Sequence, residues 1–243
     1  MARRGLARES WSGFADLVLG LECAGCGRPG TGWCGACDRQ LHGPLLAGPT
    51  GAVGVPVVAA ASYEGAVRAA LLGHKDDGRL ALVGPLGLAL ARAVHALGVD
   101  EPVLLVPVPS SPAVVRRRGQ DHALRLARRA GRVLRREGGQ VRVEPWLSSK
   151  GPVRDQVGLD VAQRRANKEA TIVVRRLVGG RRGRPVVVVD DIVTTGASLV
   201  ASVGRLQAAG VRVVGAATVA AVELRKGGDH SIRGAESAGP PIA

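Results

Sequence analysis

The sequence predicts an α/β fold in which a mainly parallel sheet carries helices on both faces. From residue 100 onward, short apolar segments alternate with segments of helical periodicity, which is the pattern of strands joined by crossover helices. Residues 103–108 and 185–189 are continuous apolar runs, as expected for strands buried on both faces. Aromatic residues make up only 2% of the 243 residues, so the core must consist of Ala, Val and Leu. Such a core favours helices on a parallel sheet over an aromatic-rich β-sandwich.

The individual elements follow from the hydrophobic pattern and its breakers. The expected strands are apolar runs, many rich in β-branched residues, at residues 55–63, 103–108, 141–146, 171–174, 185–189 and 211–222. The expected helices have apolar residues at helical spacing, at residues 64–72, 80–97, 119–137, 158–167 and 197–209. Gly73 and Gly78 separate the first two helices, and Gly210 ends the last. Residues 147–156 are expected to form a polar loop.

The chain divides into three regions by composition. Residues 1–50 are expected to form a small module: a short amphipathic helix with Trp11 and Phe14 on one face, a four-cysteine segment, and a linker. The Gly- and Pro-rich residues 43–54 form that linker. Residues 51–225 form the α/β domain. Residues 226–243 are rich in Gly, Ser and Pro and are expected to be disordered.

The hydropathy pattern argues against a membrane protein. No stretch of 18 apolar residues lacks a charge, so no membrane span is expected. Near the start, only residues 17–21 form an uninterrupted run of apolar residues or glycine, which is too short for a signal peptide. We therefore expect a cytoplasmic protein.

The charge is strongly basic, with 34 Lys and Arg against 20 Asp and Glu and a net charge of +14. Lysine occurs only four times, so arginine dominates; this is consistent with a GC-rich coding sequence and a solvated basic surface, or with a site for a polyanion. The scarcity of aromatic residues disfavours recognition of single strands by base stacking. A phosphate-rich small ligand or a nucleic-acid backbone fits this composition better. The 46% hydrophobic content excludes a mainly disordered chain.

All four cysteines lie within residues 23–37 in the pattern C-x2-C-x7-C-x2-C, at Cys23, Cys26, Cys34 and Cys37. Two such pairs supply four thiolates, as in a tetrahedral zinc site with Zn–S distances of about 2.3 Å. The neighbouring Gly25, Gly27 and Gly35 permit the positive φ of tight turns. An Fe–S cluster or two disulfides are the alternatives, and an intracellular chain without further cysteines disfavours the disulfides. Because thiolates fill all four positions, the predicted Zn2+ is structural.

The most informative segment is residues 186–198, which read VVVVDDIVTTGAS. Four valines form a buried strand, two acids follow at its carboxyl end, and hydroxyl residues and a glycine lead into a helix. The N–H groups at a helix N-terminus bind phosphate, assisted by the helix dipole. The acids repel phosphate, so they must face another part of the ligand, such as a ribose diol or a metal ion. A simple helix cap would require only one such hydroxyl residue and would not account for the paired acids.

Residues 186–198 resemble the 5-phosphoribosyl-1-diphosphate binding motif of type I phosphoribosyltransferases. The resemblance implies that Asp190 and Asp191 hold the ribose 2′- and 3′-hydroxyls and are the catalytic acids. It also implies a type I phosphoribosyltransferase-like sheet. The residues that it assigns to the 5′-phosphate are Thr194, Thr195, Gly196, Ala197 and Ser198.

Further motifs, taken in chain order, resemble the ComF family of competence-type, amidophosphoribosyltransferase-like proteins, and the resemblance covers roughly residues 20–222. The motifs are the four-cysteine module, residues 63–78 with Lys75, Val106-Pro107-Val108-Pro109, Arg116-Arg117-Arg118-Gly119, Gln156, Arg164, Asn167 and the acidic pair. The chain departs from the family at Gln120-Asp121-His122, where the family usually has Phe-Asn-Gln.

The resemblance implies roles for several of these residues. The loop after residue 107 would bind the pyrophosphate of the donor. The residues expected to bind it are Val108, Ser110, Ser111, Arg116, Arg118 and Lys75. A plain Pro-rich turn and a solvated basic run are the alternatives. Gln156, Arg164 and Asn167 correspond to a mobile loop that closes over the donor. His74 and His122 could act as acid or base by residue type.

The predicted function is phosphoribosyl transfer to an unknown acceptor. Mg2+ would bind the pyrophosphate and ribose oxygens of the donor, and placement and electrostatics would supply the catalysis without a protein nucleophile. With all four cysteines assigned to metal, ammonia supply from glutamine is not supported. An alternative is a binding module for DNA uptake, with single-stranded DNA and a helicase-like ATPase as partners. A third is a sensor that binds phosphoribosyl diphosphate or a nucleotide without turnover. An oligomer is compatible with all three.

Overall fold

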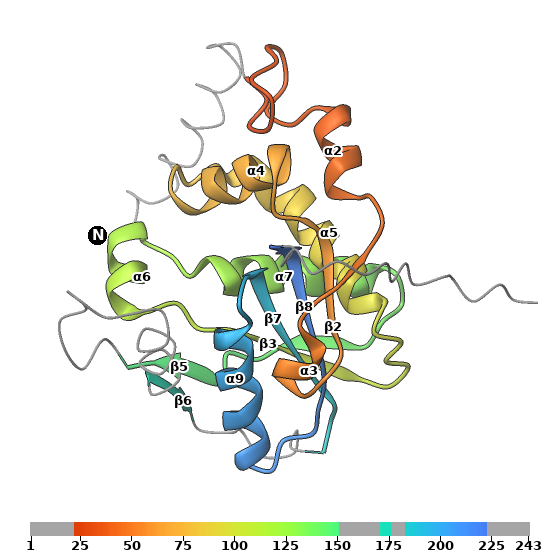
Figure 1. Cartoon of the computed structure of the whole chain (residues 1–243), viewed down its shortest axis with the longest axis vertical. Helices are drawn as coiled ribbons and strands as arrows, with labels where there is room; N and C mark the ends of the chain where they lie inside the picture. Colours follow the sequence, from red (N-terminus) through yellow and green to blue (C-terminus); the bar gives the residue numbers. More distant parts are fainter. Residues whose placement is uncertain (1–21, 151–170, 176–182, 223–243) are drawn as a thin grey trace, which may run out of the picture.

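The computed structural model describes residues 22–150, 171–175 and 183–222 (Figure 1). Its main sheet has six strands in the order β1-β2-β8-β7-β3-β4. These are β1 (Leu46–Ala47), β2 (Val57–Ser62), β3 (Val103–Pro107), β4 (Val141–Val143), β7 (Val186–Val193) and β8 (Val213–Ala221). All neighbours pair in parallel except β1, which runs antiparallel to β2 at the edge.

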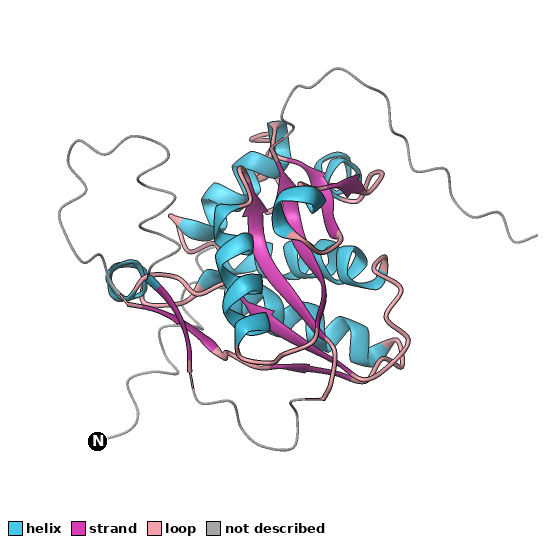
Figure 2. Cartoon of the chain, turned by 60° about the horizontal axis from the view of Figure 1, so that its bottom comes forward, coloured by secondary structure: helices cyan, strands magenta, loops and turns pink. Residues whose placement is uncertain are grey.

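Helices cover both faces of this sheet (Figure 2). One face carries α5 (Val83–His95) and α7 (His122–Arg136), which also pack on each other. The other face carries α9 (Ala197–Ala208) and the short α3 (Thr50–Val53). Side chains alternate along each strand, so Val187 of β7 is buried with the first group and Val188 with the second. The predicted α/β architecture with helices on both faces is confirmed.

The remaining helices lie at the edge of this arrangement. They are α2 (Gly35–Leu41), α4 (Gly65–Lys75), the 3-10 turn η1 (Leu80–Leu82) and α6 (Pro112–Arg118). Figure 1 shows α2 and the four-cysteine segment at the top, next to α4. Among the described residues, no helix is both long and apolar enough to cross a membrane.

Residues 43–54 do not form the predicted linker. They contribute β1, which pairs with β2, and α3, which packs against α9. Leu41, just before this segment, is fully buried in the same core as α5 and α7. These two elements could not be predicted from the sequence, because a two-residue edge strand and a single helical turn are too short to show a hydrophobic period.

The loop expected at residues 147–156 is wrong for its first three residues, and residues 151–156 lie outside the described residues. Leu147–Ser149 forms β5, which pairs antiparallel with β6 (Ile172–Val174) in a separate two-stranded sheet. The predicted strand at residues 141–146 accordingly ends at Val143. The strand expected at residues 171–174 is confirmed, but its partner could not be found because pairing over this distance leaves no local signal.

The helix α6 was also missed, although its boundaries are encoded locally. The hydroxyl of Ser111 accepts a hydrogen bond from the N–H of Val114 at 3.4 Å, Pro112 occupies the first turn, and Gly119 ends the helix with φ of +73°. The helix was missed because it is too short for a helical pattern of hydrophobic residues to be recognised. The expected helices near the start and at residues 158–167 and the expected disordered tail lie outside the described residues.

Candidate functional site

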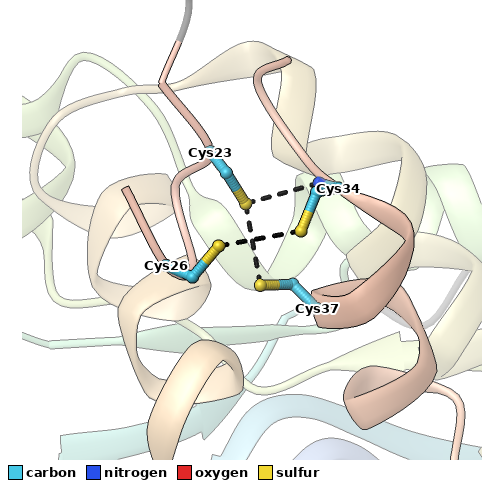
Figure 3. Close-up of side chains that lie close together, drawn as sticks. All are labelled: Cys23, Cys26, Cys34 and Cys37. Atoms are coloured by element: carbon cyan, nitrogen blue, oxygen red, sulfur yellow. Dashed lines mark hydrogen bonds between the residues drawn. The ribbon is translucent and has the colours of Figure 1, made fainter. Parts of the chain in front are cut away.

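The four cysteine sulfurs converge on one point (Figure 3). They all lie within 4.8 Å of one another, and none forms a disulfide. The Sγ atoms of Cys23 and Cys37 are 3.6 Å apart, and those of Cys26 and Cys34 are 3.7 Å apart. A tetrahedral zinc ion with Zn–S bonds of about 2.3 Å requires sulfurs about 3.8 Å apart. The cluster therefore fits a four-thiolate metal site and does not support the alternative of two disulfides.

The surroundings of these thiols favour a bound cation. Burial raises the pKa of Cys23, but hydrogen bonds from the backbone of Cys34, Gly25 and Cys26 outweigh it and lower that pKa to about 6. A backbone hydrogen bond from Cys37 likewise lowers the pKa of Cys34. Burial raises the pKa of Cys37, and the neighbouring sulfurs raise it further. Four thiolates this close repel one another, and a cation among them removes that repulsion.

The cysteine module is packed tightly against α4. A Cβ on Gly25 would lie 2.7 Å from the Sγ of Cys37 and 2.8 Å from the Cβ of Ala66. Gly25 is therefore required for close packing, whereas Gly27, with φ of +72°, is required for its turn. Gly35 does not have the positive φ that the sequence suggested, since it opens α2.

A second candidate site lies at the carboxyl edge of the main sheet. There, a cavity of about 590 Å3 collects residues from segments far apart in the sequence. The predicted residues that line it are Lys75, Val108, Ser110, Ser111, Arg118, Asp190, Asp191, Thr194 and Ser198. Parallel strands bring the loops after β3 and β7 to one edge, where ligands of such sheets bind.

The acidic pair lies within β7 rather than after it. The neighbouring strand β3 ends at Pro107, which pairs with Val189. Beyond that point β7 continues to pair with β8, but its other edge pairs with no described strand. Asp190 and Asp191 therefore face the cavity while remaining fixed in a strand. A carboxyl oxygen of Asp190 accepts the N–H of Asp191 at 2.8 Å.

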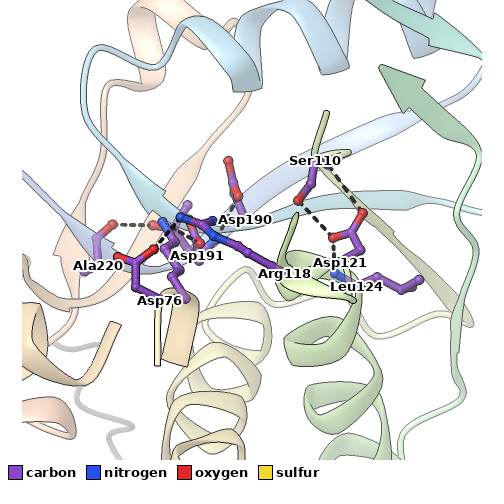
Figure 4. Close-up of polar contacts among 10 residues, drawn as sticks. Asp76, Ser110, Arg118, Asp121, Leu124, Asp190, Asp191 and Ala220 are labelled. Carbon is purple, nitrogen blue, oxygen red and sulfur yellow. Dashed lines mark hydrogen bonds and ion pairs between the residues drawn. The ribbon is translucent and has the colours of Figure 1, made fainter. Parts of the chain in front are cut away.

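Two ion pairs join the end of α4 to this site. The Nζ of Lys75 lies 2.6 Å from Oδ2 of Asp191, and the Nη2 of Arg118 lies 2.6 Å from Oδ1 of Asp76 (Figure 4). Lys75 and Arg118 thus bring positive charge to the cavity, and their role in pyrophosphate binding stays a prediction. Arg116 is exposed on α6 and does not line the cavity.

The loop before α9 has the form expected of a phosphate site. Gly196 precedes the helix with φ of +79°, and no side chain caps the helix N-terminus. A Cβ on Gly196 would also lie 3.1 Å from the Cγ of Pro49. Thr194 and Ser198 line the cavity, whereas Thr195 is exposed and Ala197 is buried in the first turn. The free N–H groups of the first turn are a suitable partner for an anion.

In the loop after β3, donor groups that were expected to bind a ligand already form hydrogen bonds within the protein. The N–H of Val108 donates to the carbonyl oxygen of Val189 at 2.9 Å, so it is not available to a ligand in this structure. Both the N–H and the hydroxyl of Ser110 donate to the carboxylate of Asp121, each at 3.3 Å. Asp121 also caps α7 by accepting the N–H of Leu124 at 3.1 Å (Figure 4). Asp121, one of the three residues at which the chain differs from the ComF pattern, therefore holds the loop after β3. An asparagine side-chain oxygen could accept the same hydrogen bonds.

Several cavity residues were not among the predicted ligands. Ser149 ends β5, Lys150 directly follows β5, and Thr171 directly precedes β6. They were missed because the pairing of these two short strands, which brings them to the cavity, was not predicted. His122 also lines the cavity, and its ring meets that of His74 edge to face at 5.1 Å. Burial lowers the pKa of His74 to about 4 and also lowers the pKa of His122. Gln156, Arg164 and Asn167 lie outside the described residues.

Part of the chain is similar in sequence to known proteins. Residues 150–232, which include the acidic pair and the loop before α9, match the phosphoribosyl transferase domain family. This part of the chain is phosphoribosyltransferase-like. It is similar to an orotate phosphoribosyltransferase of Sorangium cellulosum, with 43% identity over 72 residues. That similarity covers 28% of this chain and 35% of the relative, so the chain spans about a third of the relative's length.

Among solved structures, a UMP synthase of Leishmania donovani aligns with 58% of this chain and 23% of its own. The identity is 18% and the TM-score is 0.34. The family match and the sequence relative support the type I phosphoribosyltransferase superfamily, as the motif at residues 186–198 predicted.

Proposed function

We propose that this protein binds 5-phosphoribosyl-1-diphosphate together with Mg2+ and transfers its phosphoribosyl group to an acceptor. The observation that carries the proposal is a single cavity lined both by Asp190 and Asp191 and by the loop that opens α9. Carboxylates accept hydrogen bonds from a ribose diol, and the helix N-terminus receives a phosphate. One sugar phosphate can use both at once.

The remaining cavity residues suit the diphosphate of this donor. Lys75 and Arg118 supply positive charge beside the acidic pair, and Arg118 can form two parallel hydrogen bonds to one phosphate. As the bond from C1 to the diphosphate breaks, negative charge grows on the leaving group and the sugar becomes oxocarbenium-like. Positive groups in the cavity stabilise the negative charge on the leaving diphosphate, and the acidic pair lies near the positive charge on the sugar.

Mg2+ is expected to arrive with the donor. Among the described residues, only Asp190 and Asp191 bring carboxylates to the cavity, and Asp191 is already paired with Lys75. This is not a carboxylate cluster that would hold an ion alone, but it leaves room for one chelated by the donor. When bound, Mg2+ neutralises the diphosphate and polarises its oxygens.

We assign Zn2+ to the four-cysteine site and place the protein in the ComF family. Sulfur ligands at tetrahedral spacing support zinc, and its four filled positions make it structural. Unpaired thiols are consistent with a cytoplasmic location. The cysteine module next to a phosphoribosyltransferase-like segment supports the family, whose competence link suggests a helicase-like ATPase as a partner.

The proposal is tested by thermal stabilisation with phosphoribosyl diphosphate and Mg2+, followed by pyrophosphate release against a panel of acceptors. A donor at 100 times its Kd should add about 2.7 kcal/mol. The double change Asp190→Asn with Asp191→Asn should abolish both signals without unfolding the protein, whereas Asp100→Asn, which lies away from the cavity, should change neither. No stabilisation of the wild type would reject the proposal, and stabilisation without pyrophosphate release from any acceptor would favour the sensor.

A second candidate function is binding to a nucleic-acid backbone, such as single-stranded DNA. A groove of about 310 Å3 between α7 and β4 is lined by Arg128, Arg132, Arg135 and Arg142, with Glu144 as its carboxylate. Within the described part of the chain, Arg128, Arg132 and Arg142 form no ion pair with another described residue. No aromatic side chain lines the groove, which favours contacts to phosphates over contacts to bases.

Salt dependence tests this second function. If these arginines contact phosphates, the double change Arg128→Gln with Arg132→Gln should reduce the slope of log K against log salt by about 1.4 for a single strand. Arg205→Gln, on the opposite face of the sheet, should leave the slope unchanged. An unchanged slope in the double variant, or no binding at all, would remove this candidate.

A further inference from the structure

The Lys75–Asp191 pair presents a conflict between two proposed ligand-binding residues. Lys75 is expected to meet the diphosphate and Asp191 the ribose, yet their side chains lie 2.6 Å apart. An arriving diphosphate carries more negative charge than one carboxylate and competes for the ammonium group. When Lys75 moves to it, Asp191, only 7% exposed, loses its partner. Ribose hydroxyls can donate hydrogen bonds to Asp191 but bring no positive charge, and an unpaired buried charge is costly.

Two histidines lie next to this pair. His74 directly precedes Lys75 at the end of α4, and His122 begins α7 and lines the cavity. Their rings are 5.1 Å apart with an angle of 89° between their planes. The residues are 0% and 2% exposed. They therefore link the segment that carries Lys75 to the wall of the cavity.

All four ring nitrogens of this pair are buried, and none forms a hydrogen bond to the side chain of another described residue; the backbone of His122 lies close enough to His74 to favour its charged form. Buried polar groups are normally paired, and leaving one unpaired destabilises the folded state. Apolar rings of similar size would avoid this cost. An imidazole differs from such a ring in having a nitrogen lone pair that accepts a proton near neutral pH.

Charges from the neighbouring elements act on the pair in opposite directions. Arg118 of α6 and Arg125 of α7 oppose a positive imidazole, whereas Asp191 of β7 and Asp121, which caps α7, favour it. Burial is the largest of these influences, and it lowers the pKa of both rings and favours their neutral forms. Departure of Lys75 from Asp191 and arrival of an anion would both shift this balance toward the charged form.

We propose that the His74–His122 pair is the proton acceptor of this site: when an anionic diphosphate draws Lys75 away from Asp191, one imidazole takes up a proton from solvent. The inference rests on the proposed function and identifies positioning residues for it. The proton binds to a ring nitrogen lone pair and returns to solvent when the diphosphate leaves. Two imidazolium rings at this separation would repel each other, so the pair accepts one proton.

The test is calorimetry of phosphoribosyl diphosphate with Mg2+ near pH 6.5, in two buffers of different ionisation enthalpy. The dependence of the heat on the buffer gives the number of protons bound. The wild type should take up a fraction approaching about one proton more than the double variant His74→Gln with His122→Gln, which leaves no imidazole in the pair. Protonation of the donor's own phosphates cancels in this difference. His95→Gln, on exposed α5 surface away from the cavity, should match the wild type.

Lys75→Met provides a second measurement that does not alter the histidines. Without Lys75, Asp191 has no ammonium partner before the ligand arrives, so the proton should already be bound and uptake on binding should decrease. Equal uptake by the wild type, the double histidine variant and Lys75→Met, with the donor still bound, would overturn this inference and leave the proposed function intact. Failure of the wild type to bind the donor would reject both.

Discussion

The two candidate sites are built in opposite ways. The cysteines of the candidate metal site all lie within residues 23–37, on a turn and the start of α2. The cavity takes its residues from α4, the loop after β3, α6, α7, the β5–β6 pair, β7 and the start of α9, between Lys75 and Ser198. The first can be recognised from spacing alone because its geometry is local. The second requires the sheet to be assembled before its parts meet.

The largest expected effect tests the local site. Cys37→Ser removes a buried thiolate from the cluster, so the site should lose its metal and the module should unfold. Structural zinc contributes on the order of 10 kcal/mol in small modules. Metal content by elemental analysis and thermal denaturation with and without a chelator measure this. Zinc retained at one per chain, with an unchanged melting temperature, would contradict the four-thiolate assignment.

The next effect tests the buried histidines of the assembled site. The pKa of His74 is lowered to about 4, below its ordinary value of 6.5. The neutral ring therefore favours the folded state above pH 6.5, and this contribution is lost as pH falls from 6.5 toward 4. The expected loss from His74 between about pH 7.5 and about pH 5 is roughly 2 kcal/mol. Urea unfolding should show a smaller loss for His74→Gln, and a loss in His95→Gln equal to that of the wild type.

A smaller effect compares two glycines beside and within α9. Gly196→Ala places a side chain at φ of +79° and 3.1 Å from Pro49, so it should cost about 1–3 kcal/mol and weaken donor binding. Gly204→Ala lies in the helix with nothing within 4 Å and should stabilise by about 0.5–1 kcal/mol. Urea unfolding of both variants measures this. Equal effects would mean that the loop conformation does not depend on Gly196.

The smallest effect concerns the departure from the family pattern. Asp121→Ala removes the cap of α7 and the acceptor of Ser110, and should cost about 1 kcal/mol. Asp121→Asn keeps an acceptor oxygen and should cost less than about 0.5 kcal/mol. Chemical denaturation distinguishes the two. A large loss in the asparagine variant would show that the charge of Asp121, rather than its oxygen, holds the loop.

Part of the assembled site could still be predicted from the sequence. Asp190 and Asp191 follow four valines and precede a glycine and hydroxyl residues, so both the strand and the next helix were evident. Ser149 and Thr171 were not found, because β5 and β6 are short and pair with each other across residues 151–170. Val108 was expected to donate to a ligand. It directly follows the end of β3, however, and its N–H donates to the carbonyl oxygen of Val189 in the neighbouring strand β7.

The sequence by itself determined the four-cysteine cluster, the α/β class and the phosphoribosyltransferase-like segment, because each depends on patterns within single turns, strands or helices. Only the tertiary structure decided that Lys75 pairs with Asp191, that His74 meets His122, and that residues 43–54 join the sheet. These contacts join residues distant in sequence. They form only when burial of the core brings separate elements together, so no local sequence pattern predicts them.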